Sequence, residues 1–405
     1  MMNAPFMTNS RVVRICFYLL LPGFFIYHSL VGMGLLPAFL GGYSTVMSAL
    51  LLLPLSLVYA HHLLAAREHR LAFDAIYLCF IVYYANVLMV QYSVGVHGNA
   101  VPEQFGIVFQ FLTLFMLSRL APLGEPGFQR WLLAFLVLMT AVIGFNADEG
   151  TFIVAALELL QANDKLANYQ AYAFVYSVVM LYVAAPLKLR WQRMLVYLIC
   201  IPTLFLNGAR TEFIGVLLLV CLIEFLESKH KVLTLLVMTA LIGIGIASLP
   251  LLADLYPESR TVLLFLDYSD DISANERAQM LTHGWRSIVA SPWLGSFQSH
   301  AIGEHIHNAL SAWVDLGLLG FVVFAALIAV PAVDLFLLQR PNFLNPTYRL
   351  AFSMVFLTVL FSITAKHYTH QLFPLALGIY SRHLIECRNR RPIKPQVLRP
   401  TIITA

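Results

Sequence analysis

Charged residues are scarce in this sequence. Of its 405 residues, 11% are Asp, Glu, Lys or Arg, and 60% are hydrophobic. Soluble globular proteins carry about 25% charged residues, so a soluble fold of this length could not cover its surface with so few. The composition excludes a soluble globular protein and favours a polytopic membrane protein, whose outer surface faces lipid.

Cysteine is also scarce, and common catalytic motifs are missing. No CxxC or Cys/His zinc spacing occurs, and four of the five cysteines lie in apolar stretches, namely Cys16, Cys79, Cys200 and Cys221. We therefore expect neither disulfides nor structural zinc. The sequence has no P-loop, Rossmann fingerprint, zincin motif or GxSxG elbow. The net charge of +4 does not indicate nucleic acid. We expect no cofactor, no bound metal and no nucleic-acid partner.

Long apolar segments are abundant. Twelve of them approach the roughly 20 residues that cross a bilayer, at about 15–34, 44–65, 72–92, 103–118, 131–147, 170–187, 194–208, 211–227, 232–253, 309–338, 348–365 and 370–386. The sequence therefore predicts an all-α polytopic membrane protein with about 12 transmembrane helices. Residues 15–253 would hold helices 1–9, and residues 309–386 would hold helices 10–12.

Lysine and arginine are distributed unevenly between alternate loops. Of the 25 cations, all but six fall on the side that also holds the N-terminal residues 1–14 and the basic tail 387–405. Because cytoplasmic loops are enriched in Lys and Arg, both termini are predicted to be cytoplasmic. The six exceptions lie on the far side and each needs a physical reason; they are Lys165, Arg210, Arg260, Arg277, Arg286 and Lys366.

The longest polar segment, residues 254–308, lies on the far side between predicted helices 9 and 10. Loops of this length are usually functional. Apolar residues recur at helical spacing between Asn275 and Val289, which predicts an amphipathic helix lying on the bundle. Arg277 would lie in its first turn, where backbone N–H groups favour anions. The alternative is an interfacial helix whose arginine only reaches the membrane surface.

Arg210 lies in a tight turn, Asn207-Gly208-Ala209-Arg210-Thr211-Glu212, between two apolar segments. An arginine held there would be partly desolvated, and its fork of donors matches phosphate oxygens. We interpret it as an anion clamp. A lipid-headgroup anchor or an ion pair with Glu212 is the alternative.

The sequence His305-Ile306-His307-Asn308 directly precedes the tenth apolar segment. Three interpretations stay open: zinc binding by His300, Glu304, His305 and His307, a structural helix cap, and a general base at the membrane surface. Within the following segment, Asp315 lies near Gly317 and Gly320, two residues that permit close helix contact. Acidic residues in the eighth segment, Glu212 and Glu224, keep a transporter alternative open.

Three short motifs follow one another along the chain. The first is Ala209-Arg210-Thr211, and the second is Arg277 and Trp285 followed by Pro292-Trp293-Leu294-Gly295. The third is His307-Asn308 followed by Asp315-Leu316-Gly317-Leu318-Leu319-Gly320. In this pattern, over about residues 200–330, the chain resembles the O-antigen ligase and O-antigen polymerase superfamily of bacterial envelope glycosyltransferases. It departs from the family at Ala209, Ser296 and Asp315, where Ser, Gly and Glu are more usual.

The resemblance implies a glycosyltransferase that works at the periplasmic face of the bacterial inner membrane. Such enzymes transfer a glycan from undecaprenyl pyrophosphate to an acceptor hydroxyl, and need neither nucleotide sugar nor metal. Carried over by motif, Arg210 and Arg277 would grip the pyrophosphate, and His307 would orient or deprotonate the acceptor, with Asn308 in support. The weaker candidates for contacting phosphate or sugar are Arg286, Arg260, Lys366 and Asp315.

The same resemblance leaves two activities open. We favour a polymerase that joins repeat units of O-antigen or exopolysaccharide. The alternative is a ligase that transfers finished glycan to lipid A–core, and a flippase or transporter is the alternative from another class. The expected partners are the lipid-linked glycan, an acceptor glycan or lipid A–core, and membrane lipid. Whether a chain-length regulator also binds is left open by the sequence.

Overall fold

The computed structural model describes residues 4–40, 42–65, 69–93, 100–148, 151–152, 167–256, 259, 261–262, 272–297, 306–339 and 341–390. Its regular structure is almost entirely helical. The helices are α1 (Ala4–Leu20), α2 (Pro22–Gly32), α3 (Tyr43–Ala65), α4 (Ala72–Ser93), α5 (Ala100–Leu120), α6 (Pro126–Phe145), α8 (Tyr169–Ala184), α9 (Arg190–Asn207), α10 (Arg210–Glu227), α11 (Lys231–Ala247), α12 (Leu249–Leu255), α14 (Ile272–Ala290), α15 (Ser311–Val333), the π-helical turn η3 (Asp334–Leu338), α16 (Pro346–Thr364) and α17 (Leu372–Arg390). Strands β1 (Ala147–Asp148) and β2 (Thr151–Phe152) form a short antiparallel hairpin.

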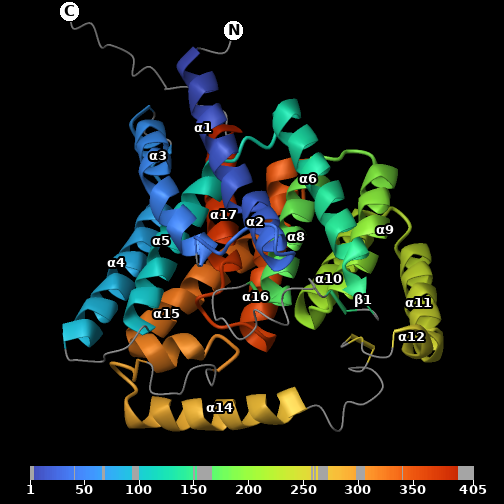
Figure 1. Ribbon diagram of the computed structural model, residues 1–405. Coiled ribbons are helices and arrows are strands. Elements are labelled where there is room, and N and C mark those ends of the chain that lie inside the picture. Colours follow the sequence, from blue (N-terminus) through green and yellow to red (C-terminus); the bar gives the residue numbers. More distant parts are fainter. Residues whose placement is uncertain are drawn as a thin grey trace, which may run out of the picture.

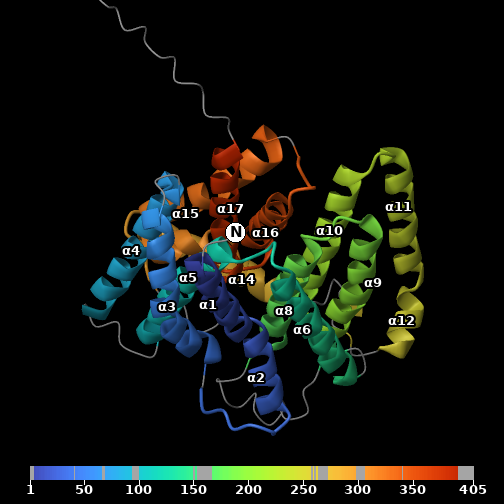
Figure 2. The ribbon, with the colours of Figure 1, turned by 90° about the horizontal axis from the view of Figure 1, so that it is seen from above.

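The helices form one bundle with two distinct ends (Figure 1). At one end α1 begins and α17 ends, and we call this the terminal face. Helix α14 lies crosswise at the other end, which we call the α14 face (Figure 1). Seen along the bundle, α11 and α12 stand at its rim, whereas α8 and α16 lie further inside (Figure 2).

The rim of the bundle exposes apolar side chains where a soluble protein would carry charge. In α11, Thr234 is the one buried residue, and Leu233, Leu236, Leu241 and Ile244 are each at least 60% exposed. By contrast, every residue of α8 from Tyr172 to Ala184 is buried. An exposed apolar face of this kind is stable in hydrocarbon and not in water.

In the described part of the chain, six helical segments are long and apolar enough to cross a membrane, or seven if the bent pair α11 and α12 is one span. The protein is thus a helical, multi-pass membrane protein. The other helices that match predicted spans are shorter or more polar: α8 has 16 residues, and α10 carries charged side chains in its first and last turns. The count of twelve spans therefore stays a prediction.

Charged side chains inside the bundle are paired between elements. Arg119 Nη2 of α5 lies 2.8 Å from Asp74 Oδ2 of α4, and both side chains are at most 5% exposed. Arg193 of α9 and Arg349 of α16 lie 2.5 and 2.9 Å from the carboxylate of Glu227 of α10. Because removing one partner of a buried pair costs about 3–5 kcal/mol, these contacts hold the helices in register.

Helix α14 docks on the start of α15 through its smallest residue. Gly284 packs against the side chain of Ile306, and Ile288 is buried beside it. The helix covers the stretch for which the sequence predicts an amphipathic helix, but two of its large apolar residues do not face the bundle. Trp285 and Val289 are 53% and 67% exposed. The close approach at Gly284, which has no side chain, turns these larger residues away from the bundle.

The turn after α14 packs against an interruption in helix α15 and forms backbone hydrogen bonds with it. Gly317 there has φ +70° and ψ −177°, which breaks the helix. The amide of Leu318 instead donates to the carbonyl of Pro292 at 3.0 Å. A Cβ on Gly295 would lie 2.6 Å from the Gly317 nitrogen. Gly295 of the Pro-x-x-Gly motif and Gly317, the first glycine of the Gly-x-x-Gly motif, thus allow two backbone segments to touch.

Replacing Gly317 with alanine is expected to lower the free energy of unfolding by about 2 kcal/mol or more. Its backbone angles are in a region essentially reserved for glycine, and a Cβ would collide with the carbonyl of Trp293. Thermal unfolding of the detergent-solubilised protein measures the loss. Gly243→Ala is the control because a Cβ there meets nothing within 4 Å. Equal melting of Gly317→Ala and wild type would contradict this role of Gly317.

Candidate functional site

A polar cavity of about 300 Å³ opens at the α14 face. It lies where α8 and α10 begin and where residues 365–371 connect α16 to α17. Its walls are unusually polar for this protein, and they include Asn168, Gln170, Thr211, His307, Lys366, His367, Thr369, His370 and Gln371. We call it the α14-face cavity.

The start of α10 forms one wall because the turn before it is so short. Gly208, with φ +77°, ends α9, and α10 begins at Arg210. A positive φ is favourable for glycine, so the chain can reverse here within two residues. Thr211 consequently lines the cavity, and Arg210 precedes it in the first turn. The amide groups of a helix N-terminus favour an anion at this position.

An ion pair fixes residues 365–371 against α10. Lys366 Nζ lies 2.7 Å from Glu212 Oε1, and the Glu212 side chain is 2% exposed. The same ammonium group donates to Gln170 Oε1 of α8 at 3.1 Å. Glu212 is therefore paired with Lys366. The pair brings three distant chain segments to one cavity.

Three histidines line the same cavity. His367 Nε2 lies 3.5 Å from the buried Asp315 Oδ2, and its Nδ1 is 2.8 Å from Thr369 Oγ1. The Thr369 amide also points at Nδ1, at 3.4 Å, so Nδ1 is assigned as the acceptor and Nε2–H faces the carboxylate. Asp315, which does not itself line the cavity, thus orients the ring of His367, which does.

His370 lies between the rings of Phe174 and Phe361, at centroid distances of 5.3 and 6.0 Å. Burial lowers the pKa of His370 well below its ordinary value of 6.5, and the positive charge of Lys366 lowers it further. His370 is therefore neutral at pH 7 and can accept a hydrogen bond from a ligand.

The residues predicted from the sequence separate into three groups. His307 and Lys366 line the cavity, and Arg210 lies beside the cavity residue Thr211. Asp315 is buried and acts on the cavity through His367. Asn308 forms the turn before α15, where its Oδ1 accepts from the Leu310 amide at 2.9 Å.

The remaining candidates come from the long polar segment. Arg286 is exposed on α14 and is not among the residues that line the cavity. Arg277 lies in the first turns of α14, but its side chain is outside the described part of the structure, and Arg260 lies outside the described residues. The structure therefore leaves the prediction for Arg277 and Arg260 open.

Gln170, His367, Thr369 and His370 are among the cavity residues that sequence reasoning missed. A signal for two of them was present, because Lys366-His367-Tyr368-Thr369-His370 places two histidines beside a cation on the cation-poor side. Gln170 carried no such signal. It matters only because the start of α8 packs next to Lys366.

The zinc interpretation concerns residues that the structure describes only in part. Within the described ranges, no group of three or more His, Cys, Asp or Glu could hold a metal ion. His300, Glu304 and His305 lie outside those ranges. His307, the fourth residue of that interpretation, lines the cavity.

The cavity combines groups that bind anions with groups that move protons. Lys366 and Thr211 at the start of α10 line it together with the imidazoles of His307, His367 and His370, and Arg210 directly precedes Thr211. Together with the fold, this defines a multi-pass membrane protein with a polar binding cavity at one end of its helices. The sequence matches no protein-family model and no curated protein.

Acidification is expected to destabilise the protein through His370. Its pKa in the folded state lies below the unfolded value of 6.5, so only the unfolded chain takes up a proton as the pH falls. This contribution is therefore fully present above about pH 6.5 and decreases below it. Between about pH 7.5 and about pH 5.5, the melting temperature of the wild type should fall further than that of His370→Gln. An equal fall in both proteins would contradict this role of His370. The exposed His230→Gln is the control and should behave like wild type.

Proposed function

We propose that the chain is a glycosyltransferase that acts at the α14 face on a glycan linked to undecaprenyl pyrophosphate. The observation that supports this most directly is the α14-face cavity. There His307, Lys366 and the start of α10 with Arg210 come together from distant parts of the sequence. These are the kinds of groups that a transfer from a pyrophosphate donor requires.

The proposed reaction is a single displacement. The acceptor hydroxyl attacks the anomeric carbon, and its new O–C bond forms as the bond from that carbon to the pyrophosphate oxygen breaks. His307 takes the hydroxyl proton. The pyrophosphate leaves with the electron pair, and Arg210, Lys366 and the amides at the start of α10 stabilise its charge.

On this proposal the α14 face is periplasmic, the terminal face is cytoplasmic and the membrane is the bacterial inner membrane. All twelve predicted segments then cross the bilayer. The distribution of cations supports this orientation, because Arg193 and Arg349 lie in the first turns of α9 and α16, whose other ends adjoin the segments that line the α14-face cavity.

The positions of charge in α10 favour the enzyme over a transporter. Glu212 lies in the first turn of the helix and Glu224 in the last, with apolar residues in between. Glu224 is bound by Arg190 and Arg193 at 2.8 and 3.2 Å. An ion pathway uses charged groups near the middle of the membrane, whereas these lie at opposite ends.

Removing the cavity groups should abolish transfer without unfolding the protein. We expect His307→Ala to lower kcat by about 10²–10⁴-fold, because it removes the proton acceptor. Arg210→Ala should lower it by about 10²–10³-fold, because it removes charge stabilisation of the leaving group. The measurement is glycosidic product formed by purified protein from lipid-linked glycan and acceptor in detergent.

Two exposed residues serve as matched controls for this assay. His230 precedes α11 at the terminal face, and Arg130 lies in the first turns of α6. Their alanine variants should keep wild-type activity and melting temperature. Full activity in both His307→Ala and Arg210→Ala would show that the assignment of the site is wrong.

The accumulated product of a deletion strain separates polymerase from ligase. We favour the polymerase, and its loss should leave lipid A–core that carries a single repeat unit. Loss of a ligase instead leaves long chains on undecaprenyl pyrophosphate. Detection of those long chains by gel electrophoresis and lipid extraction would assign the chain as a ligase.

A further inference from the structure

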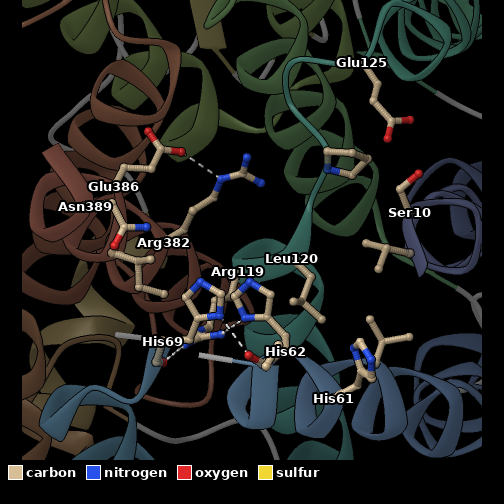
Figure 3. Close-up of a pocket in the computed structure, with 15 residues that line it drawn as sticks. Ser10, His61, His62, His69, Arg119, Leu120, Glu125, Arg382, Glu386 and Asn389 are labelled. Atoms are coloured by element: carbon tan, nitrogen blue, oxygen red, sulfur yellow. Dashed lines mark hydrogen bonds and ion pairs between the residues drawn. The ribbon is translucent and has the colours of Figure 1, made fainter. Parts of the chain in front are cut away.

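A second cavity, of about 320 Å³, opens at the terminal face, at the opposite end of the bundle from the proposed reaction. It lies among the start of α1 and the ends of α3, α5 and α17 (Figure 3). We call it the terminal-face cavity. The glycosyl transfer proposed above makes no use of it.

Arg119, His62 and His69 form one wall of this cavity, and the polar atoms of Arg119 already have partners within the protein. Arg119 Nη2 lies 2.8 Å from Asp74 Oδ2, and its Nε donates to Ser381 Oγ at 2.9 Å. Its Nη1 lies 3.3 Å from His62 Nδ1, so that nitrogen is the acceptor and the ring proton is on Nε2. The ring of His69 stacks on that of His62 at 3.9 Å (Figure 3). This wall offers a ligand a flat surface and little charge.

Three other charged side chains line the cavity, namely Arg382 and Glu386 of α17 and Glu125 before α6 (Figure 3). In Arg382 of α17, Nε donates to Glu386 Oε1 at 3.2 Å, and Nη1 donates to the carbonyl of Ala121. Its Nη2 contacts no acceptor among the described residues, and the side chain is 24% exposed. Glu125 is 30% exposed and is held only loosely, by Arg14 at 3.4 Å. A donor and an acceptor are thus both available to a ligand.

The charges around the cavity balance. Two cations, Arg119 and Arg382, and two carboxylates, Glu125 and Glu386, line it, and each of the four takes part in an ion pair. A ligand with a net charge of either sign would therefore meet repulsion as well as attraction. A ligand that carries both signs can place each against its opposite.

We propose that the terminal-face cavity binds the headgroup of a zwitterionic aminophospholipid, with a phosphate diester and a primary ammonium group. The phosphate accepts hydrogen bonds from Arg382 Nη2, and the ammonium donates to the carboxylate of Glu125. Val13, Val58 and Ile385 also line the cavity, so apolar side chains lie beside its charged groups. The acyl chains would run along the apolar helices, such as α3, where Leu53 and Leu57 are exposed. The site holds a lipid between α1 and α17 and is independent of the proposed transfer.

Native mass spectrometry of the delipidated full-length protein tests the proposal with three lipids of identical acyl chains: phosphatidylethanolamine, phosphatidylcholine and phosphatidylglycerol. The first should bind about tenfold more tightly than the others, because only it has both a phosphate and an ammonium that donates hydrogen bonds. Glu125→Gln should reduce its binding to the level of phosphatidylcholine. Arg382→Gln should weaken binding of all three. Equal binding of the three lipids to wild type would overturn the proposal.

Matched controls and a soluble probe complete the experiment. Arg130→Gln changes the charge of an exposed residue near Glu125 outside the cavity and should leave the lipid preference unchanged. Should Arg382→Gln fail to fold, Glu125→Gln decides alone, because its side chain is partly exposed. Retained preference for phosphatidylethanolamine in that variant refutes the site. Competition by soluble phosphoethanolamine at the concentration of the lipid would show that the ligand is not a membrane lipid.

Discussion

A charge inside a bundle of apolar helices must be paired, and this constraint shapes both ends of the protein. Moving an unpaired ion from water into a medium of low dielectric constant costs far more free energy than the net stability of a folded protein. The buried carboxylates Asp74, Glu212 and Glu224 accordingly each have a cation from another segment. These pairs join parts of the chain that apolar packing alone would leave free to slide, because lipid and leucine side chains are equally apolar.

The pair between Lys366 and Glu212 shows how this constraint creates the candidate site. It draws residues 365–371 against the start of α10, and so places His367 and His370 opposite Thr211. The interruption of α15 at Gly317 acts in the same region, because it accommodates the turn after α14. Ordered backbone without regular helix is therefore concentrated at the α14 face, where chemistry needs groups of different kinds at close range.

Several features of the site could be predicted because they depend on local sequence. The two-residue turn before Arg210 needs a residue that tolerates positive φ, and Gly208 supplies it. His307 was expected at the start of a helix and lies four residues before α15. Other features could not be predicted. The partner of Glu212 and the histidine that Asp315 orients are separated from them by long stretches of sequence.

Hydrophobicity and charge act residue by residue, so the class of protein, the alternation of its cations and the candidates Arg210, His307 and Lys366 could be predicted before folding was considered. The folded structure alone reveals which carboxylate neutralises Lys366, which face of α14 is buried and where the two cavities open. Such choices depend on distances between segments that the chain brings together after folding, so no local pattern encodes them.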